Sequence, residues 1–374
     1  MDQLLQQIVA GLEVGSYYSL IGMAIVMIMK STDVPNFAMA EMGLLAAYVS
    51  WWLAAGDDTQ MDLFVGKVAS PGWAFGPAVF VGLVFAALLG FGVQYFLIRP
   101  LTGLSNQPFS YLFSIGLGLA LISQFRDNGL PSFIDWFPGL GGGYPLGIAI
   151  VLAAITVPLT YMVLRRWVKK LDIVDHFPLL LLTIGLTFAL ASFIENLYGA
   201  TPQRFEAPWS GDTFDIGDTR IGWDQVISIG VGVVIALALA AFFRSKWGVR
   251  MRAIAEDGPT ARMLGINAGR ISLLAWGIGT LVAGAAMILN TSSTVLGLGS
   301  AEGLILKGFI AAVLGGFVSL PGTFAGGLLV GVAEAVAGGQ IDTSLQPTMA
   351  LLIVVVVLLV APDGLSRQAK LREV

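Results

Sequence analysis

The chain has 374 residues, of which 56% are hydrophobic and 12% are charged, and its mean hydropathy is +0.82. Soluble domains carry about one quarter charged residues, so this composition excludes a soluble fold. The formal net charge is −4, which lacks the basic excess of a nucleic-acid-binding surface. The chain has no cysteine and one histidine, His176, so we expect no disulfide, no metal site and no nucleic-acid partner.

Apolar stretches of about 20 residues recur along the chain, and this is the length that crosses a bilayer as an α-helix. Short loops with Asp, Lys, Arg, Pro and Gly separate these stretches. The pattern predicts an all-α fold, a polytopic transmembrane helical bundle that forms a single domain over residues 1–374. We expect about 11 spans, near residues 11–29, 37–55, 78–98, 108–125, 144–164, 178–197, 225–243, 271–290, 304–318, 322–338 and 347–361.

The distribution of basic residues predicts the orientation of the bundle. Lys and Arg collect in cytoplasmic loops, whereas Asp and Glu have little effect on topology. With the N-terminus outside, the predicted cytoplasmic segments hold fifteen of the 20 Lys and Arg residues. The opposite side then holds only Lys67, Arg126, Arg204, Arg220 and Lys307. This bias predicts that the N-terminus lies outside and the C-terminus inside.

Residues 304–338 leave two arrangements open, because the two predicted spans there are short and are joined through Ser319, Leu320 and Pro321. They form either two full crossings or one re-entrant hairpin, and both arrangements return the chain to the same side. Glycines along these spans allow helix backbones to approach closely.

Residues 115–123 and 184–192 share Ile, Gly, Leu, Ala, Leu and Ser at matching positions. We interpret residues 100–176 as an inserted or duplicated helix pair. The alternative is a chance match, because membrane helices draw on few residue types. Internal repeats are frequent in transport proteins.

A long polar segment, residues 244–270, joins two predicted spans and is charged and helix-prone. We expect one short helix that ends at Gly258 and Pro259, and a second that ends at Gly265, whose missing side chain suits a left-handed C-cap. Two such helices at a membrane face would form a docking surface. The alternative is an amphipathic helix on lipid headgroups, but the acidic pair Glu256 and Asp257 inside this basic loop favours a protein partner.

Ionisable side chains inside the predicted spans are costly and usually face the bundle interior. Glu13, Glu195 and Lys307 lie near span ends, where their side chains could reach the membrane surface. Glu41 lies one helical turn into its span, just after Asn36, where the free amides of a helix start could receive a polar solute. The predicted translocation path comprises Asn36, Glu41, Gly315, Gly316 and Glu334.

Four blocks of sequence carry a recognisable pattern. The first two blocks are Gly11-Leu12, Gly15-Ser16, Tyr18 and Leu20, and then Asn36-Phe37-Ala38, Glu41, Leu45 and Ala47-Tyr48. The third is Ala255-Glu256-Asp257, Ala261, Leu264-Gly265-Ile266-Asn267 and Arg270. The fourth is Ala311-Ala312-Val313-Leu314-Gly315-Gly316, Ser319, Pro321-Gly322, Gly326-Gly327, Gly331 and Glu334. In content and in order, these blocks resemble the LIV-type branched-chain amino acid ABC permeases.

This resemblance implies a multi-pass permease subunit of an ATP-binding cassette importer in the cell inner membrane. Its solute would be a branched-chain amino acid or a similar small polar molecule, such as urea or a short amide. A second permease chain, identical or related, would complete the pore, and an extracytoplasmic solute-binding protein would deliver the solute. ATPase subunits would dock on the loop through Arg252, Glu256, Asp257, Leu264, Gly265, Asn267 and Arg270.

The chain has no G-x-x-x-x-G-K-[ST] phosphate loop, so ATP would be bound by separate subunits, and we expect no cofactor and no enzyme activity in this chain. The sequence departs from the family where Met39-Ala40 replace the usual His-Gly, and where Ala46 and Val318 replace glycine. The competing interpretation is a secondary transporter or channel without an ATPase, but the spans hold few carboxylates and no filter-like motif.

Overall fold

The computed structural model describes residues 2–56, 60–63, 66–99, 177–217, 219–343 and 346–360. The predicted spans near 108–125 and 144–164, the predicted inserted helix pair and His176 lie outside these ranges. The described helices are α1 (Asp2–Thr32), α2 (Met39–Ala54), α3 (Phe75–Gly92) with the π-helix η1 (Val93–Ile98), α8 (Phe177–Tyr198), α9 (Trp223–Arg244), α10 (Lys246–Glu256), α11 (Gly258–Met263), α12 (Ala268–Ser293), α13 (Leu298–Leu314), α14 (Leu320–Gln340) and α15 (Gln346–Val360). The polytopic helical fold is thereby confirmed.

Six of the described helices are long and apolar enough to cross a membrane: α1, α3 with η1, α8, α9, α12 and α14. The helices α2, α13 and α15 are shorter, with 16, 17 and 15 residues. The most apolar stretches of α1 and α12 are 83% and 78% buried, whereas those of α3, α8 and α9 are 22% buried. The first two helices therefore form the centre of the bundle, and the other three leave apolar surface free for lipid.

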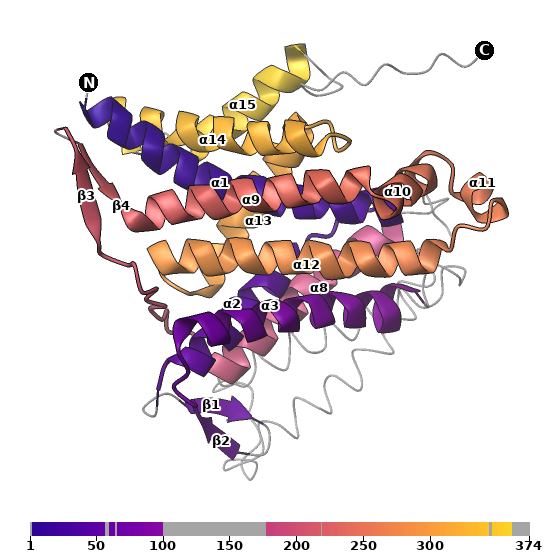
Figure 1. Cartoon of the computed structure of the whole chain (residues 1–374), viewed down its shortest axis with the longest axis horizontal. Helices are drawn as coiled ribbons and strands as arrows, with labels where there is room; N and C mark the ends of the chain where they lie inside the picture. The colour runs from indigo at the N-terminus through magenta and orange to yellow at the C-terminus, as the bar shows by residue number, and fades with distance from the viewer. Residues whose placement is uncertain are drawn as a thin grey trace, which may run out of the picture.

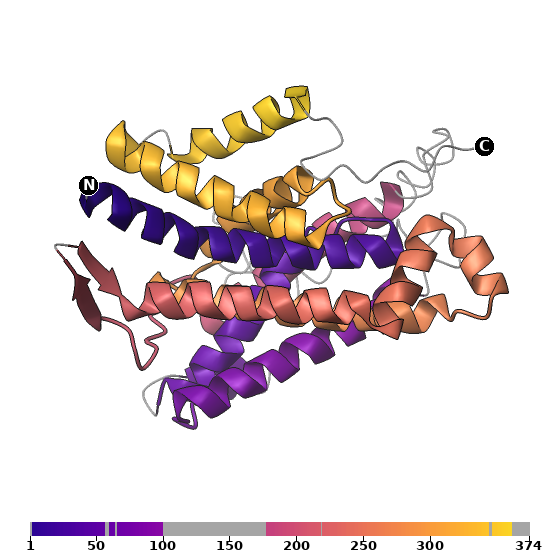
Figure 2. The same cartoon turned by 45° about the horizontal axis from the view of Figure 1, so that its top comes forward.

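The bundle has two different ends (Figure 1). The N-terminus of α1 lies at one end with the hairpin of β3 (Thr213–Ile216) and β4 (Thr219–Gly222), and α10 and α11 lie at the other. Figure 2 shows the same separation from a second direction. A second hairpin, β1 (Gln60–Leu63) with β2 (Gly66–Ala69), follows α2. These two antiparallel hairpins are not among the elements predicted from the sequence.

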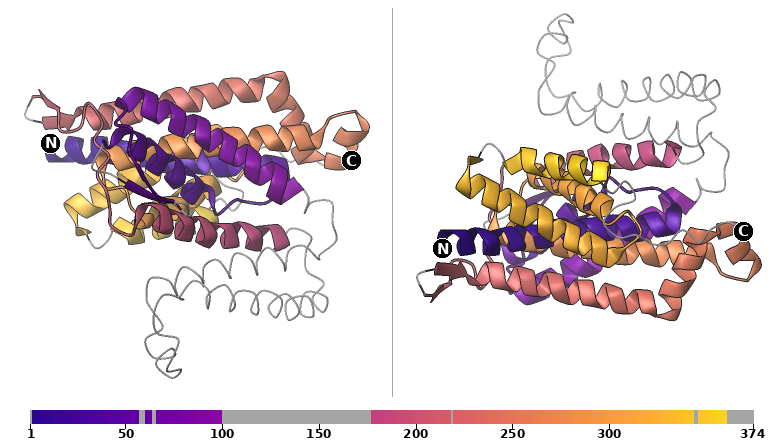
Figure 3. Two further views of the ribbon diagram at one scale, coloured as in Figure 1. Left: turned by 90° about the horizontal axis from the view of Figure 1, so that it is seen from below. Right: turned by 90° about the horizontal axis from the view of Figure 1, so that it is seen from above.

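The backbones of α1 and α14 are in direct contact. A Cβ atom on Gly11 or Gly15 would overlap the backbone of α14, and one on Gly327 or Gly331 would overlap the backbone of α1. The contacts run in opposite order along the two helices, which are therefore antiparallel. The predicted close approach of helices at glycine is confirmed here. Seen from above in Figure 3, α14 and α15 lie next to each other on one face of the bundle.

The turn between α13 and α14 lies beside the middle of α1 and short of its end. The side chain of Thr323, in the first turn of α14, lies against the backbone of α1 at Gly22. From Gly22, α1 continues to Thr32, which is about 15 Å at 1.5 Å per residue. Of these two helices, α14 alone is long and apolar enough to cross a membrane, so the choice between two full crossings and a re-entrant hairpin for residues 304–338 stays a prediction.

Candidate translocation site and coupling loop

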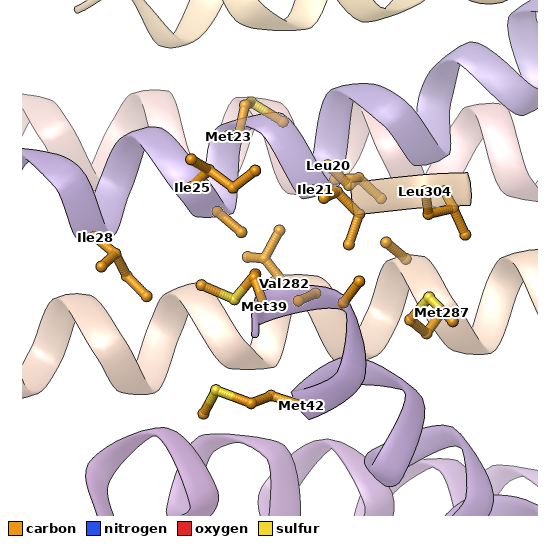
Figure 4. Close-up of a cluster of buried hydrophobic side chains, with 14 of the residues drawn as sticks. Leu20, Ile21, Met23, Ile25, Ile28, Met39, Met42, Val282, Met287 and Leu304 are labelled. Atoms are coloured by element: carbon orange, nitrogen blue, oxygen red, sulfur yellow. The ribbon is translucent and has the colours of Figure 1, made fainter. Parts of the chain in front are cut away.

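The helix α2 begins inside the bundle. After α1 ends at Thr32 the chain reverses at Asp33, whose φ is +61°, and runs back to the first turn of α2. That turn lies against the middle of α12, where a Cβ on Gly43 would meet the Ala283 carbonyl at 2.6 Å. Figure 4 shows Met39 beside Val282 of α12. A helix start is thus surrounded by packed side chains.

Asn36 and Glu41 flank this helix start and are 1% and 2% exposed. The Asn36 Oδ1 accepts a hydrogen bond from the Ala38 backbone N–H at 3.0 Å, which fixes the chain just before the helix. The Glu41 Oε2 is buried and has no hydrogen-bond partner. Among the described residues, no ion pair includes Glu41. A buried carboxylate without a partner is unfavourable, and such groups cluster at functional sites.

Three phenyl rings connect the start of α2 to the turn after α13. The ring centroids of Phe37 and Phe309 are 5.4 Å apart, and those of Phe309 and Phe317 are 5.3 Å apart. The structure therefore joins the segment just before α2 to the turn after α13 through one aromatic cluster. Phe309 and Phe317 are not among the site residues predicted from the sequence.

The two predicted path glycines of this turn have conformational and packing roles. Gly316 has φ +67° and donates its N–H to the Val313 carbonyl at 2.8 Å, as expected for the left-handed residue of a helix C-cap. A Cβ on Gly315 would lie 2.6 Å from the Thr323 backbone nitrogen, so only glycine allows this contact. Whether the two glycines also line a path stays a prediction.

Glu334, the remaining predicted path residue, is paired. Its Oε2 accepts hydrogen bonds from the Lys307 Nζ at 2.9 Å and from the Tyr18 hydroxyl at 2.9 Å. The Lys307 Nζ also donates to the Tyr18 hydroxyl at 2.8 Å. This triad, Tyr18, Lys307 and Glu334, joins α1, α13 and α14. The expectation that Lys307 reaches the membrane surface is wrong, because its ammonium group has a carboxylate inside the bundle.

The carboxylates of Glu41 and Glu334 lie on opposite sides of α13. Residues of an α-helix advance by about 100°, so Phe309, which contacts α2, and Lys307, which contacts α14, are separated by about 200° around the helix. The structure thus divides the predicted path residues into two groups. Asn36 and Glu41 lie close to Phe37 along the chain and the turn glycines lie close to Phe317, whereas Glu334 belongs to the triad.

The loop 244–270 folds into α10 and α11, so the prediction of two short helices is confirmed, with one correction. Gly258 and Pro259 begin α11 and do not end the preceding helix. The reason is that Asp257 caps α11, accepting the Thr260 backbone N–H at 3.0 Å, and proline fits a first helical turn. The Thr260 hydroxyl also donates to Asp257. These hydrogen bonds hold the pKa of Asp257 below its usual value.

Gly265 ends α11 as predicted, with φ +81°. Its N–H bonds the Arg262 carbonyl and the N–H of Ile266 bonds the Ala261 carbonyl, both at 3.0 Å, which is a Schellman motif. Asn267 then caps α12 by accepting the Arg270 backbone N–H at 3.1 Å. The predicted coupling residues Asp257, Gly265 and Asn267 therefore set the course of the loop.

The tip of this loop presents apolar side chains to the surroundings. Met263 and Leu264 are 80% and 76% exposed, and Glu256 is exposed on the preceding helix. Arg252 donates from Nη1 to the Phe243 carbonyl at 3.0 Å, which ties α10 back to α9. The charges of Arg252 and Glu256 act on Lys30 at the end of α1. The loop is thus a fixed, exposed surface in contact with the central helix.

Helices of this length and composition form a multi-pass membrane protein, and a helix that starts in its interior is a feature of membrane transporters. The family described as the permease component of the branched-chain amino acid transport system matches residues 111–362. This chain belongs to that family. The resemblance read from the four sequence blocks is thereby confirmed.

Related proteins match over nearly the full length of the chain. The high-affinity branched-chain amino acid transport system permease protein LivH of Escherichia coli K12 is 26% identical, over 99% of this chain and 97% of its own length. The permease protein BraD of Pseudomonas aeruginosa is 25% identical, over 99% and 98%. A probable LivH of Methanocaldococcus jannaschii is 22% identical, over 67% and 87%. No solved structure matches the chain.

Proposed function

We propose that this chain is the permease subunit of an ATP-driven importer that carries branched-chain amino acids through the cell inner membrane. The membership of the permease family supports this proposal most directly. The exposed loop with Met263 and Leu264 at its tip supports the coupling to a separate motor protein, because exposed apolar residues of this size on a fixed loop suit a protein interface.

In this proposal the loop lies in the cytoplasm and the N-terminus outside. The bias of Lys and Arg supports this orientation, and the structure places the loop and the N-terminus at opposite ends of the bundle. ATPase subunits would dock on the loop and bind all of the ATP. A second permease chain would complete the pore, and a solute-binding protein would approach the end that carries β3 and β4.

The first experiment is affinity purification of the tagged chain from its native membrane, with mass spectrometry of the proteins that accompany it. We expect ATPase subunits to co-purify with the wild type and to be lost from Gly265→Ala. No atom lies within 4 Å of a Cβ at this position, so the only cost of the substitution is the left-handed backbone. Gly258→Ala, in the same loop and without a positive φ, is the matched control and should retain the ATPase.

The second experiment is uptake of leucine, urea and a short amide by proteoliposomes that contain the complete system. ATP-dependent uptake of leucine supports the proposal. If only urea or the amide is taken up with ATP, the importer stands but its proposed substrate is wrong. A chain that purifies alone and moves solute without ATP would contradict the importer and establish a secondary transporter or channel.

A further inference from the structure

The buried start of α2 has hydrogen-bond donors that the helix itself does not satisfy. The first-turn amides of a helix cannot bond within that helix, and no side chain caps them in α2. The Asn36 side chain instead accepts from Ala38, the residue before the helix. In an apolar interior each polar backbone group needs a partner, so the first-turn N–H groups of Met39 and Ala40 are the donors of α2 that a buried ligand would engage.

The side chain of Glu41 provides an unsatisfied acceptor at the same place. The residue is 2% exposed, and its carboxylate turns back towards the first turn, where it interacts with its own backbone N–H. The second oxygen, Oε2, has no partner. Donors for an anion and an acceptor for a cation therefore lie within one helical turn.

The group that matches both is the zwitterionic end of an α-amino acid, in which an ammonium and a carboxylate share one carbon neighbour. We propose that Glu41 pairs with the ammonium group of the transported amino acid, while the free amides of Met39 and Ala40 bind its carboxylate. This assignment rests on the proposed function and adds to it the chemical groups that the permease itself recognises.

The neighbours of this helix start suit the rest of such a substrate. Phe37 stacks on Phe309 at 5.4 Å, and Met39 and Met42 are buried beside it. Rings and thioether side chains offer an adaptable apolar surface to a branched alkyl group. The site therefore combines recognition of a zwitterion with tolerance for several apolar side chains.

An exposed carboxylate lies near enough to this site for its charge to act on it. Glu302 is exposed on α13, and its charge acts on Glu41. Glu302 and Phe309 are seven residues apart and so lie on the same face of α13. A negative charge outside the site would raise the local concentration of ammonium groups.

The test is binding of radiolabelled leucine to the purified permease with its ATPase subunits and without a solute-binding protein. The competitor is the 2-hydroxy analogue of leucine, in which a hydroxyl replaces the ammonium. We expect the wild type to bind leucine about tenfold or more tightly than the hydroxy acid, because a hydrogen bond between charged groups contributes this much to affinity. Glu41→Gln should lose this preference.

The matched control is Glu334→Gln, which alters another buried carboxylate of the bundle. It should change the affinities for leucine and for the hydroxy acid by the same factor. The melting temperatures of both variants in detergent show whether they are folded. If Glu41→Gln keeps the preference for leucine, or if the wild type binds both ligands equally, the assignment is overturned.

Uptake by the complete ATP-driven system is measured in parallel to separate the two proposals. If the wild type fails to take up leucine, the proposed function fails. If uptake succeeds but the wild-type permease binds no leucine, or Glu41→Gln keeps its preference, only the site at Glu41 is wrong.

Discussion

Two of the buried carboxylates of the bundle, Glu334 and Glu41, differ in how they are satisfied. Glu334 is neutralised by Lys307 and receives the Tyr18 hydroxyl as a second donor. Glu41 has no cation among the described residues, and one of its oxygens has no partner. A paired carboxylate joins helices. A buried carboxylate without a partner destabilises the fold, and a cationic ligand that pairs with it removes this destabilisation. This difference is the basis on which we assign Glu334 a structural role and propose a functional role for Glu41.

The largest effect is expected from Lys307→Met, which leaves the Glu334 carboxylate buried without a cation, as the Glu41 carboxylate is. Removing one partner of a buried ion pair costs about 3–5 kcal/mol. The Lys307 side chain is 24% exposed, so we expect a loss near the lower end of that range. Unfolding of the purified chain in detergent micelles measures it, and an unchanged stability would show that Glu334 needs no cation.

The double variant Lys307→Met with Glu334→Gln sharpens this result. It removes both charges, so neither is left buried alone, and its stability should return to within about 1 kcal/mol of the wild type. The two single variants and the double variant together form a thermodynamic cycle. A double variant as unstable as Lys307→Met would assign the loss to the lysine stem and not to the charge.

Glu41→Gln should change the free energy of unfolding in the opposite direction. Without substrate it removes an unsatisfied buried charge, so we expect a gain of about 1 kcal/mol in the free energy of unfolding. The same variant should bind leucine less well, which is the exchange of stability for function expected at a site. A loss of stability would instead show that the Glu41 carboxylate supports the fold.

The smallest effect concerns Asp257, whose carboxylate is exposed to solvent and accepts hydrogen bonds from Thr260. Its pKa is lowered by the hydrogen bonds from Thr260, so the cap is present above the ordinary aspartate pKa of about 4 and is lost only as the pH falls through the lowered value. Hydrogen exchange of the Thr260 amide should therefore be independent of pH between about 5 and 8, after correction for the intrinsic rate. Asp257→Asn should keep this protection and Asp257→Ala should lose it.

Local rules predicted the parts of the site that depend on a few neighbouring residues. Gly265 follows a short helix and adopts the left-handed conformation that its position suggested. The correction at Gly258 and Pro259 is also local, since an aspartate two residues before a proline, as in Asp257-Gly258-Pro259, is itself a signal for a helix start. The β3–β4 hairpin had a signal as well, because Gly217-Asp218 between two short alternating segments is typical of a tight turn.

The ion pair of Lys307 with Glu334 could not be predicted, because 27 residues separate the two side chains along the chain. The burial of the start of α2 likewise depends on α12, more than 200 residues later. Hydropathy places helices along a sequence but contains no information about which faces meet. The sequence therefore identified Glu41 and Glu334 as unusual without showing that only Glu334 is paired.

The glycine contacts between α1 and α14 have a mechanical consequence. The backbones of the two helices are in contact at Gly15 and Gly331, so sliding one helix along the other would drive side chains into the opposite backbone. We therefore expect the two helices to move as one rigid unit. The helix pair reaches loop 244–270 at Lys30 and includes Glu334, whereas Glu41 belongs to α2. We therefore expect a displacement of this loop to change the distance between the two carboxylates.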